Sequence, residues 1–152
     1  MDQLKGKELN LKCWEVADTC IAGNLRRVSR AVANLDDVAL RPSGLRGTQC
    51  NMMTAIMLMG PVTISKLAQV LVMDRTTLTR NLGPLHKQGL VEIAPGEDQR
   101  IRIVAITNEG NRMYQQALPL WAMAQAEIAS KLGKIRVKSL LADLKATAKV
   151  VG

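Results

Sequence analysis

The amino-acid sequence predicts a mainly α-helical fold with a small β wing, and the stretch Gly60–Gly110 carries most of this prediction. Within this stretch, a first short helix is followed by the connection Val72-Met73 and then by a second helix that begins with Asp74. Two alternating segments then flank a Pro-Gly turn and predict a hairpin. Helix, tight turn, helix and hairpin together form a winged helix-turn-helix, whose second helix enters the major groove of duplex DNA. The first helix is indicated by four apolar residues at helical spacing: Ile64, Leu67, Ala68 and Leu71.

Length and charge narrow the possible partners. At 152 residues the chain is large enough for one core but small for two independent ones, so we expect a single domain over residues 1–152. The formal net charge of +8 favours an anionic partner. Readers of single-stranded nucleic acid need aromatic stacking platforms, yet the only aromatic residues are Trp14, Tyr114 and Trp121. Duplex DNA is therefore the expected ligand.

Several common signals are missing from the sequence. Met1–Lys12 is polar and charged, unlike a signal peptide, and no apolar run reaches the length of a membrane span. We therefore expect a cytoplasmic protein without a membrane partner. The three cysteines, Cys13, Cys20 and Cys50, form no CxxC or Cys/His pattern, so we expect no metal site and no cofactor.

Long helices flank the central unit on its N-terminal side. Apolar positions between Trp14 and Leu35 predict one long helix, and from Ile21 onward they form a heptad-like seam. The run Arg41-Pro42-Ser43-Gly44 ends this pattern. Thr48 is the expected N-cap of a Met-rich apolar helix, Gln49–Met59.

The C-terminal part repeats this apolar character. Thr107 is the expected N-cap of a long helix, Gly133 marks a break, and Ile135–Val150 is a final helix with an apolar face. We expect residues 11–40 and 107–152 to be dimerisation helices, because a two-fold dimer would bury their apolar stripes. The alternative is that these helices pack on each other within one chain.

The DNA-binding unit is expected over residues 48–110, and its second helix can be oriented from the sequence. Leu78, Leu82 and Leu85 recur at helical spacing and define the buried face. An outward arginine can form bidentate bonds to guanine, threonine can contact base edges or a thymine methyl, and lysine meets phosphate. The candidate DNA-binding residues of the helix lie opposite that face, on its flanks or in its first turn: Arg75, Thr76, Thr77, Thr79, Arg80 and Lys87.

The hairpin adds further candidates. Its predicted strands are Leu90–Ile93 and Ile101–Ile106, with a charged turn between them. Arg100 at the tip is expected to enter a minor groove, and Asp98 is expected to orient it by a charge-assisted bond. Arg102, within the second strand, completes the candidate DNA-binding set.

These residues resemble the MarR family of bacterial regulators (the multiple antibiotic resistance regulator type). The resemblance lies in MDRTTLTRNLGPLHKQGLV and EDQRIRIVAITNEG, which include the wing motif residues Asp98 and Arg100 and the following Ile106, Thr107 and Gly110. It implies a homodimer that binds a pseudo-palindromic operator in double-stranded DNA and represses transcription until a signal intervenes. Members of this family often bind small aromatic effectors between the dimer helices and the reading unit.

Two hypotheses remain for the signal that ends repression. The resemblance favours a small aromatic effector, while Cys13 and Cys20 beside the predicted seam are a possible redox sensor or simply small buried hydrophobes. An enzyme is not expected, since the chain has one histidine, no phosphate-binding glycine loop and no nucleophile motif. A winged-helix adaptor for proteins is a further alternative, although basic residues on both helix and wing argue against it.

Overall fold

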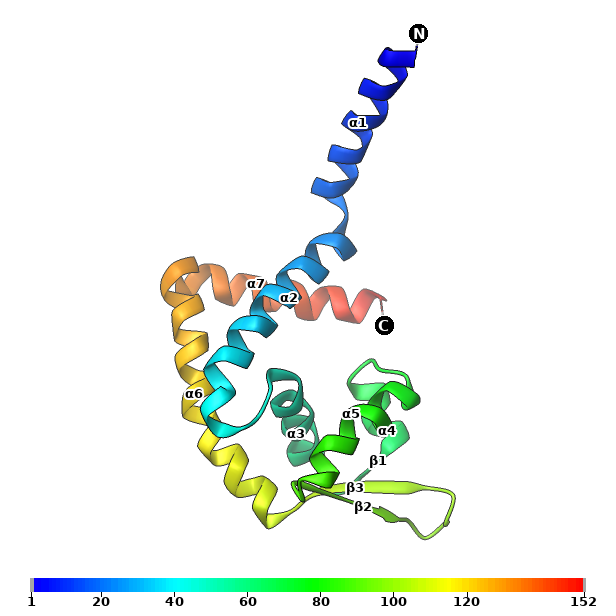
Figure 1. Ribbon diagram of the computed structural model, residues 1–152, viewed down its shortest axis with the longest axis vertical. Coiled ribbons are helices and arrows are strands. Elements are labelled where there is room, and N and C mark those ends of the chain that lie inside the picture. The colour runs from blue at the N-terminus through cyan, green and yellow to red at the C-terminus, as the bar shows by residue number, and fades with distance from the viewer. Residues whose placement is uncertain (1, 152) are drawn as a thin grey trace. The chain divides into compact units, whose positions relative to one another are not determined.

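The computed structural model describes the backbone of residues 2–151 and the side chains of residues 6–151. The chain divides into two compact units, Met1–Leu35 and Asp36–Gly152. No helix within the described residues has both the length and the apolar composition that crossing a membrane requires. The elements, in chain order, are α1 (Asp2–Thr19), α2 (Ile21–Leu40), the 3-10 helix η1 (Arg41–Ser43), α3 (Gly47–Met59), β1 (Val62–Thr63), α4 (Ile64–Val70), α5 (Arg75–Lys87), β2 (Val91–Pro95), β3 (Arg102–Ile106), α6 (Asn108–Leu132) and α7 (Lys134–Val151) (Figure 1).

The first unit contains α1 and most of α2, which meet at Cys20. The prediction of one helix through Trp14–Leu35 was therefore wrong at this point. The side-chain amide of Asn24 donates to the carbonyl oxygens of Ala17 (3.3 Å) and Asp18 (3.1 Å). These carbonyls belong to the last turn of α1, where a helix end leaves acceptors without backbone partners. Asn24 therefore stabilises the end of one helix from within the next.

The second unit contains the hydrophobic core, and α5 is anchored in it as predicted. Leu78, Leu82 and Leu85 are each 0% exposed. Burying a leucine contributes about 1.5–3 kcal/mol, so these three side chains fix which face of α5 remains outside. The other fully buried large side chains of this core come from α2, α3, α4, β2, β3 and the loops between them: Leu40, Leu45, Met52, Met53, Ile56, Leu67, Leu90, Val91 and Val104.

α3 begins earlier than the sequence predicted, so the assignment of Thr48 as its N-cap was wrong. The backbone N–H of Arg46, the residue before α3, donates to the side-chain oxygen of Gln49 (2.9 Å). The N–H of Gly47 donates to Asp37 Oδ1 (2.7 Å). These two acceptors satisfy donors at the start of the helix, and Thr48 lies exposed in its first turn.

The three strands form an antiparallel sheet in the order β1-β3-β2, and the β2–β3 hairpin is the predicted wing (Figure 1). β1 was not predicted from the sequence, because a strand of two residues is too short to show an alternation of apolar and polar residues. The prediction also ended its first strand, Leu90–Ile93, too early. The structure continues β2 to Pro95, which pairs with Arg102. β2 is an edge strand, where a proline can be accommodated without losing a bond to a further strand.

The start of α6 packs tightly against the segment between α5 and β2. The Thr107 hydroxyl donates to the carbonyl oxygen of Gly89 (2.6 Å) and accepts from the N–H of Gly110 (3.0 Å). The predicted N-cap role of Thr107 is confirmed. A Cβ atom at position 110 would lie 2.0 Å from the carbonyl oxygen of Leu90, which is backbone and cannot swing away. Only glycine fits at this contact.

Gly110→Ala should therefore lower the free energy of unfolding by about 3 kcal/mol, because the added methyl group overpacks a backbone contact. Urea denaturation followed by circular dichroism measures this loss. Gly6→Ala in the helix α1 is the control, since a Cβ atom there meets nothing within 4 Å and the next residue is not a proline. It should leave stability unchanged or raise it by up to about 1 kcal/mol, through the better helix propensity of alanine. Similar values for the two variants would contradict the proposed contact.

Candidate nucleic-acid interface

Two caps and a strained turn set the position of α5. The Thr63 hydroxyl accepts from the N–H of Lys66 at the start of α4 (3.2 Å). The connection to α5 passes through Val72, whose φ of 52° lies in the left-handed region that a β-branched residue rarely adopts. The next residue, Met73, donates its N–H to the carbonyl oxygen of Ala68 (2.9 Å). This bond ties the strained turn back to α4.

Asp74 caps the recognition helix, as predicted. Its Oδ1 accepts from the N–H of Thr77 (2.8 Å). Hydrogen bonds from the side chain and then the backbone of Thr77 hold the pKa of the Asp74 carboxyl below its usual value. The carboxylate therefore stays ionised near neutral pH. Its negative charge stabilises the helix by interacting with the positive end of the helix dipole.

The outward face of α5 carries the residues that the sequence placed there. Thr76, Arg80 and Lys87 are exposed, and Thr77 is half-buried. Thr79 is exposed too, but its hydroxyl donates to the carbonyl oxygen of Arg75 (2.8 Å). Thr79 therefore presents its methyl group and the lone pairs of its oxygen, whereas its proton is already used within the helix.

A small cleft brings together three of the predicted DNA-binding arginines, one from α5 and two from the hairpin. It has a volume of about 150 Å³ and lies between the start of α4, the start of α5 and the hairpin. Two hydroxyl residues, Thr63 and Ser65, also line it, and sequence analysis did not single them out. Guanidinium and hydroxyl groups of the kind that line this cleft are groups that bind phosphate in proteins. The three arginines that line this cleft are Arg75, Arg100 and Arg102.

Asp98 acts on the wing differently from the prediction. Its Oδ1 accepts from the backbone N–H of Arg100 (2.9 Å), and its carbonyl oxygen accepts from the N–H of Ile101 (2.9 Å). Among the side chains of residues 6–151, ion pairs form only within helices α1 and α6, so the guanidinium of Arg100 pairs with no carboxylate. The expected bond from Asp98 to that guanidinium was wrong. Asp98 orders the turn backbone and leaves the arginine side chain available.

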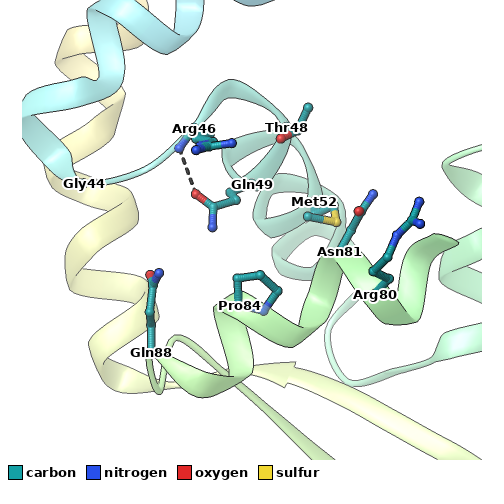
Figure 2. A pocket seen from close by; sticks show the side chains of 9 residues that line it. All are labelled: Gly44, Arg46, Thr48, Gln49, Met52, Arg80, Asn81, Pro84 and Gln88. Atoms are coloured by element: carbon teal, nitrogen blue, oxygen red, sulfur yellow. Dashed lines mark hydrogen bonds between the residues drawn. The ribbon is translucent and has the colours of Figure 1, made fainter.

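A larger groove lies between the start of α3 and α5, and Arg80 and Asn81 line it (Figure 2). Its volume is about 540 Å³. Arg46 lines the opposite wall. Sequence analysis missed Arg46 and Asn81. Arg46 precedes its helix and has no place in a helical pattern, and Asn81 lies between the buried and outward faces of α5.

The thiols differ in accessibility. Cys13 is exposed, and the half-buried Cys20 Sγ accepts from the N–H of Gly23 at 3.4 Å. Cys50 is buried, and desolvation followed by the nearby charge of Asp36 raises the pKa of its thiol. A raised pKa lowers the fraction of reactive thiolate, so Cys50 is the least suited of the three to react with an oxidant. Within the described residues, no cluster of three or more His, Cys, Asp or Glu side chains could hold a metal ion.

Comparisons with known proteins agree on one family. A family model described as "MarR family" matches residues 43–101. The transcriptional regulator MosR of M. tuberculosis, solved in complex with DNA, is 38% identical, with a TM-score of 0.75 over 86% of this chain and 97% of MosR. A cysteine-to-serine variant of E. coli MarR with operator DNA is 25% identical, with a TM-score of 0.78 over 90% and 97% of the two chains. An uncharacterised HTH-type transcriptional regulator of Bacillus subtilis, YwoH, is 27% identical over 92 residues, which are 60% of this chain and 67% of YwoH.

Arg100→Ala should weaken binding to duplex DNA more than Arg102→Ala, because Arg100 lies in the turn and Arg102 within β3. Loss of one phosphate contact in each of two subunits should reduce the salt dependence of log K by about 2 units of slope. Fluorescence anisotropy at several salt concentrations measures both quantities. Glu97→Ala, in the same turn, is the control and should not weaken binding. An unchanged affinity and slope for Arg100→Ala would show that the wing does not touch DNA.

Proposed function

This chain belongs to the MarR family of DNA-binding transcriptional regulators, and we propose that it is a homodimeric repressor released by a small aromatic effector. The observation that carries the proposal is the outward face of α5, flanked by clefts that contain arginines. That arrangement offers base-reading groups and phosphate-binding groups on one surface.

Each candidate side chain receives a role in this proposal. Arg80 reads a guanine in the major groove, and threonine side chains of α5 contact neighbouring base edges. Lys87 contacts phosphate, and the arginines of the wing-side cleft, Arg75, Arg100 and Arg102, contact the backbone or the minor groove. Asp98 contributes indirectly, by ordering the turn that carries Arg100. The threonines of α5 that contact base edges in this proposal are Thr76, Thr77 and Thr79.

A second copy of the chain is the proposed partner of the terminal helices, residues 11–40 and 107–152. Large apolar side chains are exposed on the helices of each unit, and exposed apolar faces mark interaction surfaces. A two-fold dimer would cover these faces and present two recognition helices to a pseudo-palindromic operator. The most exposed examples include Trp14 (71%) and Ile21 (68%) in the first unit and Ile135 (87%) in the second.

The remaining parts of the proposal concern regulation and location. We place the protein in the cytoplasm, where it would meet DNA, and assign it no enzymatic activity. Oxidation is the alternative signal, because Cys13 is exposed and Cys20 is partly so. Reversible release of the wild-type protein from DNA by peroxide, absent in a Cys13→Ser/Cys20→Ser variant, would favour that alternative over an aromatic effector.

Arg80→Ala should weaken operator binding by roughly 1–3 kcal/mol and relax the preference at one base position in each half-site. The physical reason is the loss of a bidentate contact that only guanine satisfies. Binding is measured on a duplex selected from a random pool with the wild-type protein, and on its single-base variants. Equal losses on selected and random duplexes would instead make Arg80 a phosphate contact.

The protein should sediment as a dimer at micromolar concentration, and Leu141→Asp on α7 should shift it toward monomer. A charge in an apolar interface costs several kcal/mol unless it is paired. Ser139→Asp adds the same charge about 160° around the helix and should leave the dimer intact. A monomeric wild-type protein, or equal effects of the two variants, would overturn the proposed dimer interface.

A further inference from the structure

The groove between α3 and α5 has a polar and positively charged lining (Figure 2). Arg46 and Arg80 supply the charge, and no carboxylate lines the groove. The ion pairs among side chains 6–151 involve neither arginine. Hydroxyl and amide groups supply further donors from both walls. The polar lining consists of Arg46, Thr48, Gln49, Arg80, Asn81 and Gln88.

The orientation of Gln49 adds to this donor character. Its side-chain oxygen is occupied, because it accepts from the N–H of Arg46 at 2.9 Å (Figure 2). The amide nitrogen therefore points away from Arg46 and toward the side of the groove formed by Pro84 (Figure 2). An amide nitrogen only donates, so a ligand that accepts hydrogen bonds is favoured over one that donates them.

The position of the groove on α5 indicates which anion it meets. At about 100° per residue, Asn81, Pro84 and Gln88 lie on one flank of the outward face, and Arg75 lies on the other. The groove follows the first flank, and the wing-side cleft adjoins the second. A recognition helix in the major groove has a sugar–phosphate backbone on each side of it. With α5 in the major groove of DNA, each of the two protein clefts therefore faces one of the DNA strands that border the major groove.

We propose that the α3–α5 groove receives the sugar–phosphate backbone of one operator strand, with Arg46 as its main phosphate contact. Thr48, Gln49 and Gln88 donate neutral hydrogen bonds to the same backbone. The protein then holds DNA on both flanks of α5, through this groove and through the wing-side cleft. This inference rests on the proposed function, since it assumes that α5 enters the major groove.

The side chain of Arg46 can be removed without removing its structural role. The structure uses the backbone N–H of Arg46 to bond Gln49, and its backbone carbonyl oxygen to accept from Cys50 (2.9 Å). Alanine retains both groups. Arg46→Ala should therefore fold normally, which thermal unfolding checks before any binding is measured.

The test compares salt-dependent binding of three variants to the duplex selected with the wild-type protein. Arg46→Ala should bind about tenfold more weakly, and its salt dependence should fall by about 2 units of slope for the two subunits. The same loss is expected on random duplex, because phosphate contacts carry no sequence information. Arg46→Lys keeps the charge and should retain the slope. Arg112→Ala removes the same charge from α6, where Arg112 pairs with Glu109, and should change neither quantity.

A second measurement locates the contact. Phosphates at the edges of each half-site are replaced one at a time by neutral methylphosphonates, with wild-type protein and with Arg46→Ala. One position in each half-site should weaken wild-type binding and have no further effect in Arg46→Ala. Additive losses at every position would overturn the inference, because two partners of one contact cannot act independently.

The outcomes separate this inference from the proposed function. A wild-type protein that selects no preferred duplex would overturn both. A wild-type protein that binds its selected duplex, together with unchanged affinity and slope for Arg46→Ala, would overturn only the groove contact. If inorganic phosphate binds the wild-type protein and Arg46→Ala removes that binding while DNA binding is unaffected, the groove is a small-anion site and the inference fails.

Discussion

The close packing of Gly110 against the carbonyl oxygen of Leu90 is the constraint on which the DNA-facing surface depends. Leu90 leads into the wing, while Gly110 lies in the first turn of α6. The hydrogen bonds of Thr107 hold the segment before the wing and the first turn of α6 in contact. A change in the direction of α6 must therefore move the root of the wing or break these bonds. Rigid packing of this kind transmits displacement, and it links the proposed dimerisation helices α6 and α7 to the reading surface.

The distribution of charge follows from the same need for a prepared surface. A carboxylate paired with a wing arginine would compete with phosphate for that arginine. In this wing the carboxylate of Asp98 is used on backbone N–H instead. The turn is thereby ordered without neutralising Arg100. Asp74 acts similarly at the start of α5, where its charge stabilises the helix end and does not pair with Arg80 or Lys87. On this surface, Asp74 and Asp98 organise the backbone, and the basic residues remain for the ligand.

Sequence reasoning succeeded where a side-chain pattern reports the structure directly. The three-leucine face of α5, the cap at Asp74 and the cap at Thr107 were predicted correctly, because helical spacing and capping chemistry are local. It failed where partners come from elsewhere in the chain. Asp37 replaces Thr48 as an acceptor at the start of α3, and nothing in the local sequence announces that contact. Arg46 and Asn81 were missed for the same reason, since segments far apart in the sequence form the groove that they line.

The first unit connects folding with assembly. None of its residues 6–35 is buried, and large side chains such as Trp14 and Leu25 are exposed. In proteins, most of the stability of a helix comes from packing of its apolar face rather than from helix propensity. A second copy that covers this face would supply the missing free energy, so ordering of α1 and dimerisation would be one event that depends on protein concentration. A signal that alters the helices beside Cys20 would then act on DNA binding by changing how firmly the two reading heads are joined.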